Sequence, residues 1–239
     1  MVFRSVRRRG GTDTIISPVW AIIPLAPFVL LTILFIAFLW SPTGLLGLQT
    51  FCMVLFLAVI LVTMMWAYIL YRVLRRRQAH FDRDALLRAG LMEYIEAKAR
   101  EMDVNVDVEL STMRWGDSVQ RMNEPRREPV LWAVLSVLIP FVIYYTLYFL
   151  SKDAGDHHWN QDGFYRQLHS CFYKLGLPPF VPPSWQPIPS RTPVLYLILT
   201  FVFYPFMIYW LYTIIVDLNR HFEMQWEVED NLVAAIRGR

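Results

Sequence analysis

The stretch PVWAIIPLAPFVLLTILFIAFLW, residues 18–40, contains no charged side chain. A helix needs about 20 consecutive apolar residues to cross a bilayer, because lipid offers no water to the backbone polar groups. Three further apolar runs cover residues 45–74, 129–150 and 193–216. The run over 45–74 is free of charge until Arg72. The sequence therefore predicts an all-α integral membrane protein, a helical bundle with about four transmembrane helices.

The composition agrees with this prediction and limits the choice of partners. Hydrophobic residues make up 56% of the 239 residues and charged residues only 18%, whereas about 25% would be charged in an ordinary soluble domain. The net charge of +3 is too small, and too split between signs, to indicate a nucleic-acid partner. Cys52 and Cys171 are too few for a disulfide framework, and we expect them to be unpaired, with a bridge between them as the alternative.

The orientation follows from the arginines that flank the apolar runs. Arg7, Arg8 and Arg9 precede the first run as in a signal peptide, but the run is too long for one, so we expect an uncleaved helix. Lysine and arginine are enriched in short cytoplasmic loops, which places both termini in the cytoplasm of a multi-pass protein of the cell membrane. The predicted segments are a basic N-terminus (1–17), a transmembrane hairpin (18–74), a cytoplasmic amphipathic segment (75–128), a spanning helix (129–150), an external amphipathic helix with a Pro-rich strap (151–192), a spanning helix (193–218) and a cytoplasmic C-terminal helix (219–239).

An internal repeat is the most informative pattern. Three segments share Tyr-x-x-Tyr and a histidine nine positions after the second tyrosine. Tyrosine suits the membrane interface, where its ring lies in lipid and its hydroxyl reaches water. We therefore expect these residues near the ends of membrane helices. The three copies are Tyr68, Tyr71 and His80; Tyr145, Tyr148 and His157; and Tyr209, Tyr212 and His221.

The repeat conflicts with simple alternation of the four predicted helices. Alternation places His80 and His221 in the cytoplasm, where they could approach each other, and His157 outside. The copies would then be inverted in the membrane, as in some transporters. Alternatively, Pro140 and Pro205 break the third and fourth runs into re-entrant pieces. We favour four plain crossings.

The segment Tyr209-Trp210-Leu211-Tyr212, followed by an acidic and polar helix, resembles an uncharacterised family of small multi-pass membrane proteins from archaea and bacteria. The resemblance covers the last third of the chain, with a fainter likeness at residues 145–153. It implies a helical membrane fold, and no activity can be carried over from it.

The chemistry expected from the sequence is sparse. No carboxylate or cysteine completes a zinc-site spacing with His157, His158 or His169, so we expect neither a metal nor a cofactor. Transporters and pumps keep ionisable residues within the membrane, and the apolar runs have none in their middle. Asp84 is a plausible helix N-cap, and catalytic residues are not predicted.

These observations favour a non-catalytic accessory, scaffold or assembly subunit of a larger membrane complex. Uncharged aromatic helices, two amphipathic interfacial helices and a proline strap are suited to packing against lipid and against other membrane subunits or further copies of the chain. The alternative is a channel or carrier for a small solute that acts as a homo-oligomer.

Overall fold

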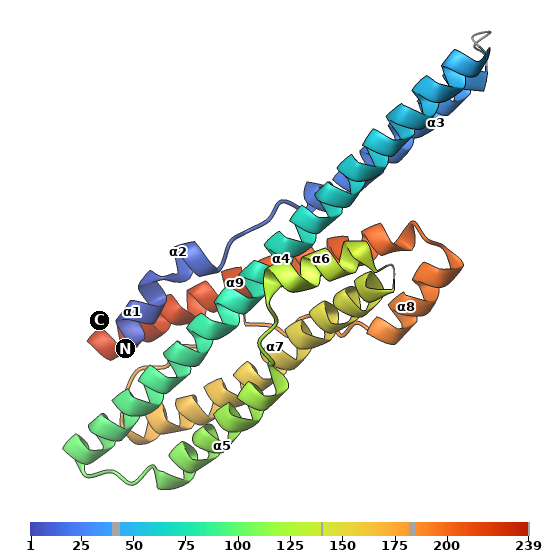
Figure 1. Ribbon diagram of the computed structural model, residues 1–239. Helices are drawn as coiled ribbons and strands as arrows, with labels where there is room; N and C mark the ends of the chain where they lie inside the picture. The colour runs from blue at the N-terminus through green and yellow to red at the C-terminus, as the bar shows by residue number, and fades with distance from the viewer. Residues whose placement is uncertain (40–43, 140, 182–184, 239) are drawn as a thin grey trace.

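The computed structural model describes residues 1–39, 44–139, 141–181 and 185–238, and for residues 27–28 and 44–46 only their backbone. Within these ranges all regular structure is helical, as the apolar and amphipathic patterns predict (Figure 1). The helices are α1 (Val2–Arg7), α2 (Arg9–Thr12), η1 (Pro18–Ala21), η2 (Ile23–Leu25), α3 (Ala26–Leu39), α4 (Gly44–Met102), α5 (Asp107–Asn123), α6 (Pro129–Leu138), α7 (Val142–Lys174), α8 (Pro193–Val202) and α9 (Phe206–Arg237).

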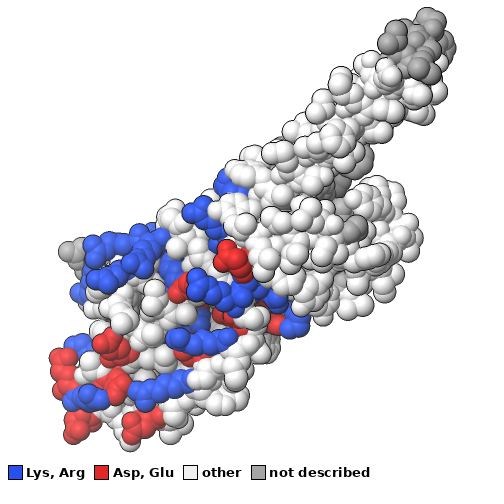
Figure 2. Space-filling view, viewed as in Figure 1, with Lys and Arg blue, Asp and Glu red and all other residues white. Residues whose placement is uncertain are grey.

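The longest helix, α4, has two parts of different character. Up to residue 71 it is free of charge and pairs with α3 in a hairpin that projects from the body of the protein as a narrow arm (Figure 1). The ring centroids of Phe38 and Phe51 lie 4.9 Å apart within this arm. Its outer surface is apolar and exposed, as in Ile33 at 57% and Phe56 at 65% (Figure 2). From Arg72 onward α4 enters the body, where about half of its residues are buried.

The third and fourth apolar runs do not form continuous helices, which corrects the prediction of single spanning helices over 129–150 and 193–218. Each run folds back into a short hairpin, α6 with α7 and α8 with α9 (Figure 1). The hydroxyls of Ser136 and Thr146, on α6 and α7, lie 2.8 Å apart. Pro205 marks the second break and precedes the first turn of α9, whereas Pro140 lies outside the described residues. Two helices, over Pro18–Leu39 and Gly47–Met102, are long and apolar enough to cross a membrane, so four crossings are not established.

The three long helices α4, α7 and α9 run in the same direction through the body. One apolar cluster takes the earlier part of each helix, for example Leu70, Leu150 and Trp210, and a second cluster takes the later part, for example Leu91 and Leu168 with Leu232. Inverted copies would instead place early residues of one helix beside late residues of another. The repeat copies are therefore parallel.

The described part of the strap after Gly176 packs on the body of the protein. Gly176 follows the end of α7 with a φ of 63°, and the amide of Leu177 donates to the Phe172 carbonyl at 2.8 Å. Further along the strap, Phe180 is buried, and the Trp185 indole donates to Asp162 on α7 at 3.2 Å. The thiols of Cys52, on the exposed arm, and of Cys171, in the second apolar cluster, are both free.

Candidate metal centre

The three histidines of the repeat meet at the centre of the body. His80 on α4, His157 on α7 and His221 on α9 are each at most 1% exposed. Their ring centroids lie 5.1 to 5.3 Å apart. The prediction that His157 lies on the opposite side of the membrane from the other two is therefore wrong. It failed because α6 and α7 form a hairpin and not one straight helix, so that His157 of α7 lies beside His80 and His221.

The spacing within the repeat explains this arrangement. Nine residues correspond to about two and a half helical turns, so each histidine points away from the face that carries the second tyrosine. The tyrosines lie on the outer surface accordingly, with Tyr68 45%, Tyr145 50%, Tyr209 48% and Tyr212 40% exposed, while Tyr71 and Tyr148 are half-buried. The pattern thus separates an interfacial face from a polar interior on the same helix.

One ring nitrogen of each histidine already has a hydrogen-bond partner. The Nδ1 atom of His80 lies 3.0 Å from Asp13, and that of His157 lies 2.6 Å from Glu124. The Nδ1 atom of His221 lies 3.2 Å from the Nδ1 atom of His158. Carboxylates that hold the outer nitrogen of a histidine are typical of metal sites, because they fix the tautomer and orient the ring.

The other ring nitrogen, Nε2, has no hydrogen-bond partner among the described residues in any of the three histidines. Buried polar atoms are nearly always satisfied, so three unsatisfied nitrogens in one cluster require an explanation. One nitrogen from each ring falls within 4.8 Å of those of the others. Around a tetrahedral zinc ion such nitrogens are about 3.3 Å apart, which small movements of the rings would achieve. The residues present therefore fit a metal ion.

Electrostatics keep the histidines in the form that binds metals. Burial lowers the pKa of His80 to about 4, although Asp13 opposes the shift. Burial likewise lowers the pKa of His157 and His221, and the neighbouring histidines lower that of His221 further. Neutral imidazole is the ligand form, so the cluster is ready to bind a cation at neutral pH. Burial alone would raise the pKa of Asp13, but His80 and Arg83 hold it well below its usual range, so this carboxylate remains charged.

Two further layers of polar side chains lie one and two helical turns beyond the histidines. In the next layer, Gln161 and Gln225 donate to Asp84 at 2.9 and 3.1 Å. The other carboxylate oxygen of Asp84 lies 3.9 Å from Nε2 of His157, so Asp84 is the nearest candidate for a fourth ligand. Its expected role as a helix N-cap is wrong, because Asp84 lies in the interior of α4. The layers are His80, His157 and His221; Asp84, Gln161 and Gln225; and Arg88, Tyr165 and Glu229.

Buried ion pairs surround the cluster and fix its partners. Arg83 contacts Asp13 at 2.6 Å and Glu229 at 2.5 Å, with all three side chains at most 1% exposed. Arg88 pairs with Asp84 and, at 2.8 Å, with Asp117. Because a buried charge is costly unless paired, these contacts hold the carboxylates in place behind the histidines.

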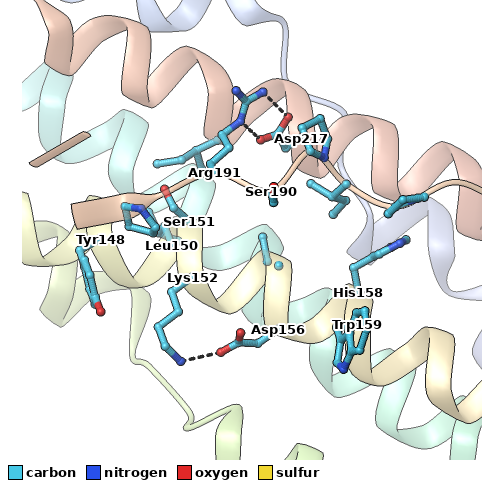
Figure 3. A pocket seen from close by; sticks show the side chains of 17 residues that line it. Tyr148, Leu150, Ser151, Lys152, Asp156, His158, Trp159, Ser190, Arg191 and Asp217 are labelled. Atoms are coloured by element: carbon cyan, nitrogen blue, oxygen red, sulfur yellow. Dashed lines mark hydrogen bonds and ion pairs between the residues drawn. The ribbon is translucent and has the colours of Figure 1, made fainter. Parts of the chain in front are cut away.

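A cavity of about 490 Å³ lies beside the cluster, between α7, α9 and the strap (Figure 3). Its charged side chains are paired with each other, Lys152 with Asp156 and Arg191 with Asp217, the latter at 2.8 Å (Figure 3). His158 lines the same cavity and contacts His221. His158 thus lies between the cavity and His221, whereas His80, His157 and His221 do not themselves line the cavity.

The sequence reading found the three histidines but none of their partners. A signal for the second layer was available, since a polar residue follows each repeat histidine by four positions, which is the same helix face. Asp13 and Glu124 carry no comparable signal. They lie 67 and 33 positions from the histidines that they contact, in segments between helices.

Comparisons with models of known protein families, with curated proteins and with solved structures found no match. The resemblance suggested by Tyr209, Trp210 and Tyr212 therefore stays a prediction, and the function has to be argued from the site itself.

Proposed function

We propose that this protein is a membrane-anchored metalloprotein that binds one transition-metal ion through Nε2 of His80, His157 and His221. The observation that carries the proposal is the meeting of three buried histidines whose Nε2 atoms are all unsatisfied, two of them with a carboxylate on Nδ1. Three imidazoles without a thiolate suit Zn²⁺, Fe²⁺ or Cu²⁺ and do not suit Mg²⁺ or Ca²⁺. With three protein ligands, a coordination position stays open for water or for Asp84, which is the arrangement of catalytic rather than structural zinc sites.

The proposed anchor is the arm formed by α3 and α4. Its length and apolar composition are those of membrane-crossing helices, and a soluble protein rarely exposes so large an apolar surface. The helices α6 and α8 have ten residues each, or about 15 Å, which is half of a hydrocarbon core of about 30 Å. We therefore propose one complete helical hairpin and two half-depth hairpins, all entering from the side of the histidine centre.

The proposed side is the cytoplasm. Arg4, Arg7 and Arg8 lie near the start of the chain, and Arg72 and Arg75 follow the end of the charge-free part of α4. An excess of arginine beside the membrane marks the cytoplasmic face. In this topology both termini and the histidine centre face the cytoplasm.

Metal binding by the protein in detergent tests the proposal directly. We expect the purified, chelator-treated chain to bind one Zn²⁺, measured by elemental mass spectrometry, and one Co²⁺, measured by the visible absorption of a low-coordinate nitrogen site. Replacing any one of the three histidines by alanine should weaken binding by about 100-fold or more, and Asp13→Asn by about 10-fold to 100-fold.

The matched control is His169→Ala, because His169 is exposed on α7 outside the cluster. It should bind both metals as the unmodified protein does. Failure of the folded, unmodified chain to bind either ion stoichiometrically, or equal effects of His169→Ala and His221→Ala, would contradict the proposal.

An accessory role in a larger complex is the second candidate function. It is favoured by an apolar cavity of about 370 Å³ between the two short hairpins, lined by aromatic side chains that include Tyr144, Tyr145 and Phe201. A helix of another membrane subunit could pack there. Gentle extraction at native abundance, followed by native gel and mass spectrometry, should find a defined complex with other subunits. A lone chain would contradict this role, and a homo-oligomer would favour the channel or carrier alternative.

A further inference from the structure

A further cavity, of about 310 Å³, lies where the charge-free part of α4 ends. Its walls come from the end of α2, from Thr14 and from about three turns of α4. Three arginines of α4 line it, Arg72, Arg75 and Arg76, together with Tyr68 and Tyr71. Basic atoms are seen at the base of the white arm in Figure 2.

These three arginines have no acidic partner in the part of the chain that the structure describes. No carboxylate among the described residues forms an ion pair with them, although most buried arginines of the body have one. Arg72 donates to the hydroxyl of Tyr68 at 2.9 Å, and Arg75 donates to that of Tyr71 at 3.3 Å. Both contacts leave the guanidinium charges uncompensated.

Arg76 supplies an independent observation. It is only 2% exposed, and its Nη atoms donate to neutral oxygens, at 2.6 Å to Asn219 and at 3.1 Å to the Ile215 carbonyl. Its Nε has no hydrogen-bond partner among the described residues. A buried guanidinium whose hydrogen-bond partners are all neutral is costly, and the negative charge of an anion in the adjoining cavity would stabilise it electrostatically.

The nearest carboxylate along the chain does not provide this anion. Asp13 lies between cavity residues Thr12 and Thr14, but its side chain bonds to His80, Arg83 and Trp226 in the body. Among the described residues, the cavity is therefore lined by three positive charges and by no carboxylate.

We infer that this cavity binds the phosphate of an anionic phospholipid headgroup, an inference that rests on the membrane anchoring proposed above. Guanidinium groups match phosphate oxygens in geometry and charge, and anionic lipids are concentrated in the cytoplasmic leaflet. The tyrosine hydroxyls that contact Arg72 and Arg75 hold these side chains at the mouth of the cavity.

The surroundings favour a lipid over a free phosphate ion. A shallow apolar depression of only about 10 Å³ adjoins the cavity and shares Tyr68 and Arg72 with it, so a lipid chain would lie across its surface and not inside it. Ile16, Trp20 and Ile69 complete its walls. The rings of Trp20 and Tyr68 lie 5.7 Å apart there, as in the aromatic belts of membrane proteins. A glycerol backbone and the start of an acyl chain would lie against these side chains, whereas a phosphate ion would make no use of them.

The electrostatics of Arg76 agree with this inference. Burial, and to a smaller extent Arg72, lowers the pKa of Arg76 to about 9. A bound phosphate would oppose both effects.

Lipid retention in bilayer nanodiscs tests the inference. The protein would be reconstituted in phosphatidylcholine with a minor share of phosphatidylglycerol, then released into detergent, and its bound lipid would be counted by native mass spectrometry. We expect one retained phosphatidylglycerol per chain. The double variant Arg72→Gln/Arg75→Gln should retain it at least about tenfold less, because two charge-assisted contacts are removed.

The matched control removes the same charge elsewhere. Arg4→Gln/Arg8→Gln replaces two exposed arginines of the N-terminal segment outside the cavity and should retain the lipid as before. If the cavity variant retains as much lipid as the unmodified protein, the inference is overturned. Loss of the lipid on adding inorganic phosphate at millimolar concentration would also overturn it, in favour of a soluble anion.

Insertion is measured separately in the same samples. Extraction by alkaline carbonate would show that the proposed anchor is wrong, and the lipid site with it. Firm insertion without any retained phosphatidylglycerol would overturn the lipid site alone.

Discussion

The buried histidines make the stability of the metal-free protein dependent on pH. His158 lies 5% exposed beside His221, and burial and the neighbouring His157 lower its pKa to about 4 from an ordinary 6.5. Below pH 6.5 the unfolded chain binds a proton at this position that the folded chain does not. Stability therefore falls as the pH decreases from about 6.5 to 4, by about 1.4 kcal/mol per pH unit for each such histidine.

Two carboxylates that contact the cluster, Asp13 and Glu124, are protonated in a different pH range. Contacts with His80 and with His157 hold the pKa values of Asp13 and Glu124 below their usual range, so these carboxylates are protonated only at lower pH. Arg83 keeps its charge throughout, since Glu229 and Asp13 outweigh its burial and raise its pKa. The histidines thus lower stability as the pH falls, whereas Asp153 and Glu229, whose pKa values are raised by burial, contribute a slope of opposite sign.

This prediction can be checked by equilibrium unfolding of the chelator-treated protein in detergent at several pH values. His158→Gln should reduce the slope of unfolding free energy by about 1.4 kcal/mol per pH unit. His169→Gln, at an exposed position, should leave the slope unchanged. An unaltered slope in His158→Gln would mean that this histidine is protonated in the folded state.

At the scale of single elements, the packing of α1 against α4 depends on a glycine. A Cβ atom at Gly90 would lie 2.7 Å from the Cβ of Met1 and 2.9 Å from the backbone nitrogen of Val2. These distances are too short, so Gly90→Ala should displace α1 from α4. Ser5 of α1 would then lose its 3.0 Å hydrogen bond to the Arg83 carbonyl.

Gly116, in α5, is the matched position for this test. A Cβ there meets no atom within 4 Å, so Gly116→Ala should stabilise the protein by about 0.5–1 kcal/mol through helix propensity alone. We expect Gly90→Ala to give no such gain and to increase hydrogen exchange over residues 2–7. If α1 is protected from hydrogen exchange as well as in the unmodified protein, the added methyl group is accommodated without displacing α1.

The elements also show which parts of the fold could be predicted from the sequence. Apolar runs and amphipathic spacing identify helices, because both depend on neighbours along the chain. They do not reveal whether a helix is continuous, because the residues beside Pro205 would be equally apolar in a hairpin and in a single helix. The meeting of His80, His157 and His221 depends on those hairpins, and Asp13 and Glu124 reach the cluster through contacts distant in sequence. Reading the polar residues four and eight positions after each histidine would have revealed the buried layers without revealing their partners.

At the scale of the whole molecule, the parallel course of α4, α7 and α9 has a consequence for topology. Because the later parts of all three helices share one apolar cluster, the far ends of α7 and α4 lie on the same side of any membrane that the arm crosses. Four plain crossings would instead expose the end of α7 to the outside. The two arrangements differ in the position of Tyr173, which is 81% exposed near the end of α7.

Labelling of single cysteines distinguishes these arrangements. In a chain with Cys52→Ser and Cys171→Ala, we expect Tyr173→Cys to react with a membrane-impermeant maleimide only after the cells are permeabilised. Arg4→Cys, at an exposed position of α1, should behave identically, because both residues belong to the body. Reaction of Tyr173→Cys in intact cells, with Arg4→Cys still protected, would require α6 and α7 to cross the membrane as one unit. That crossing would pull His157 away from His80 and His221, so the same result would also remove the metal centre.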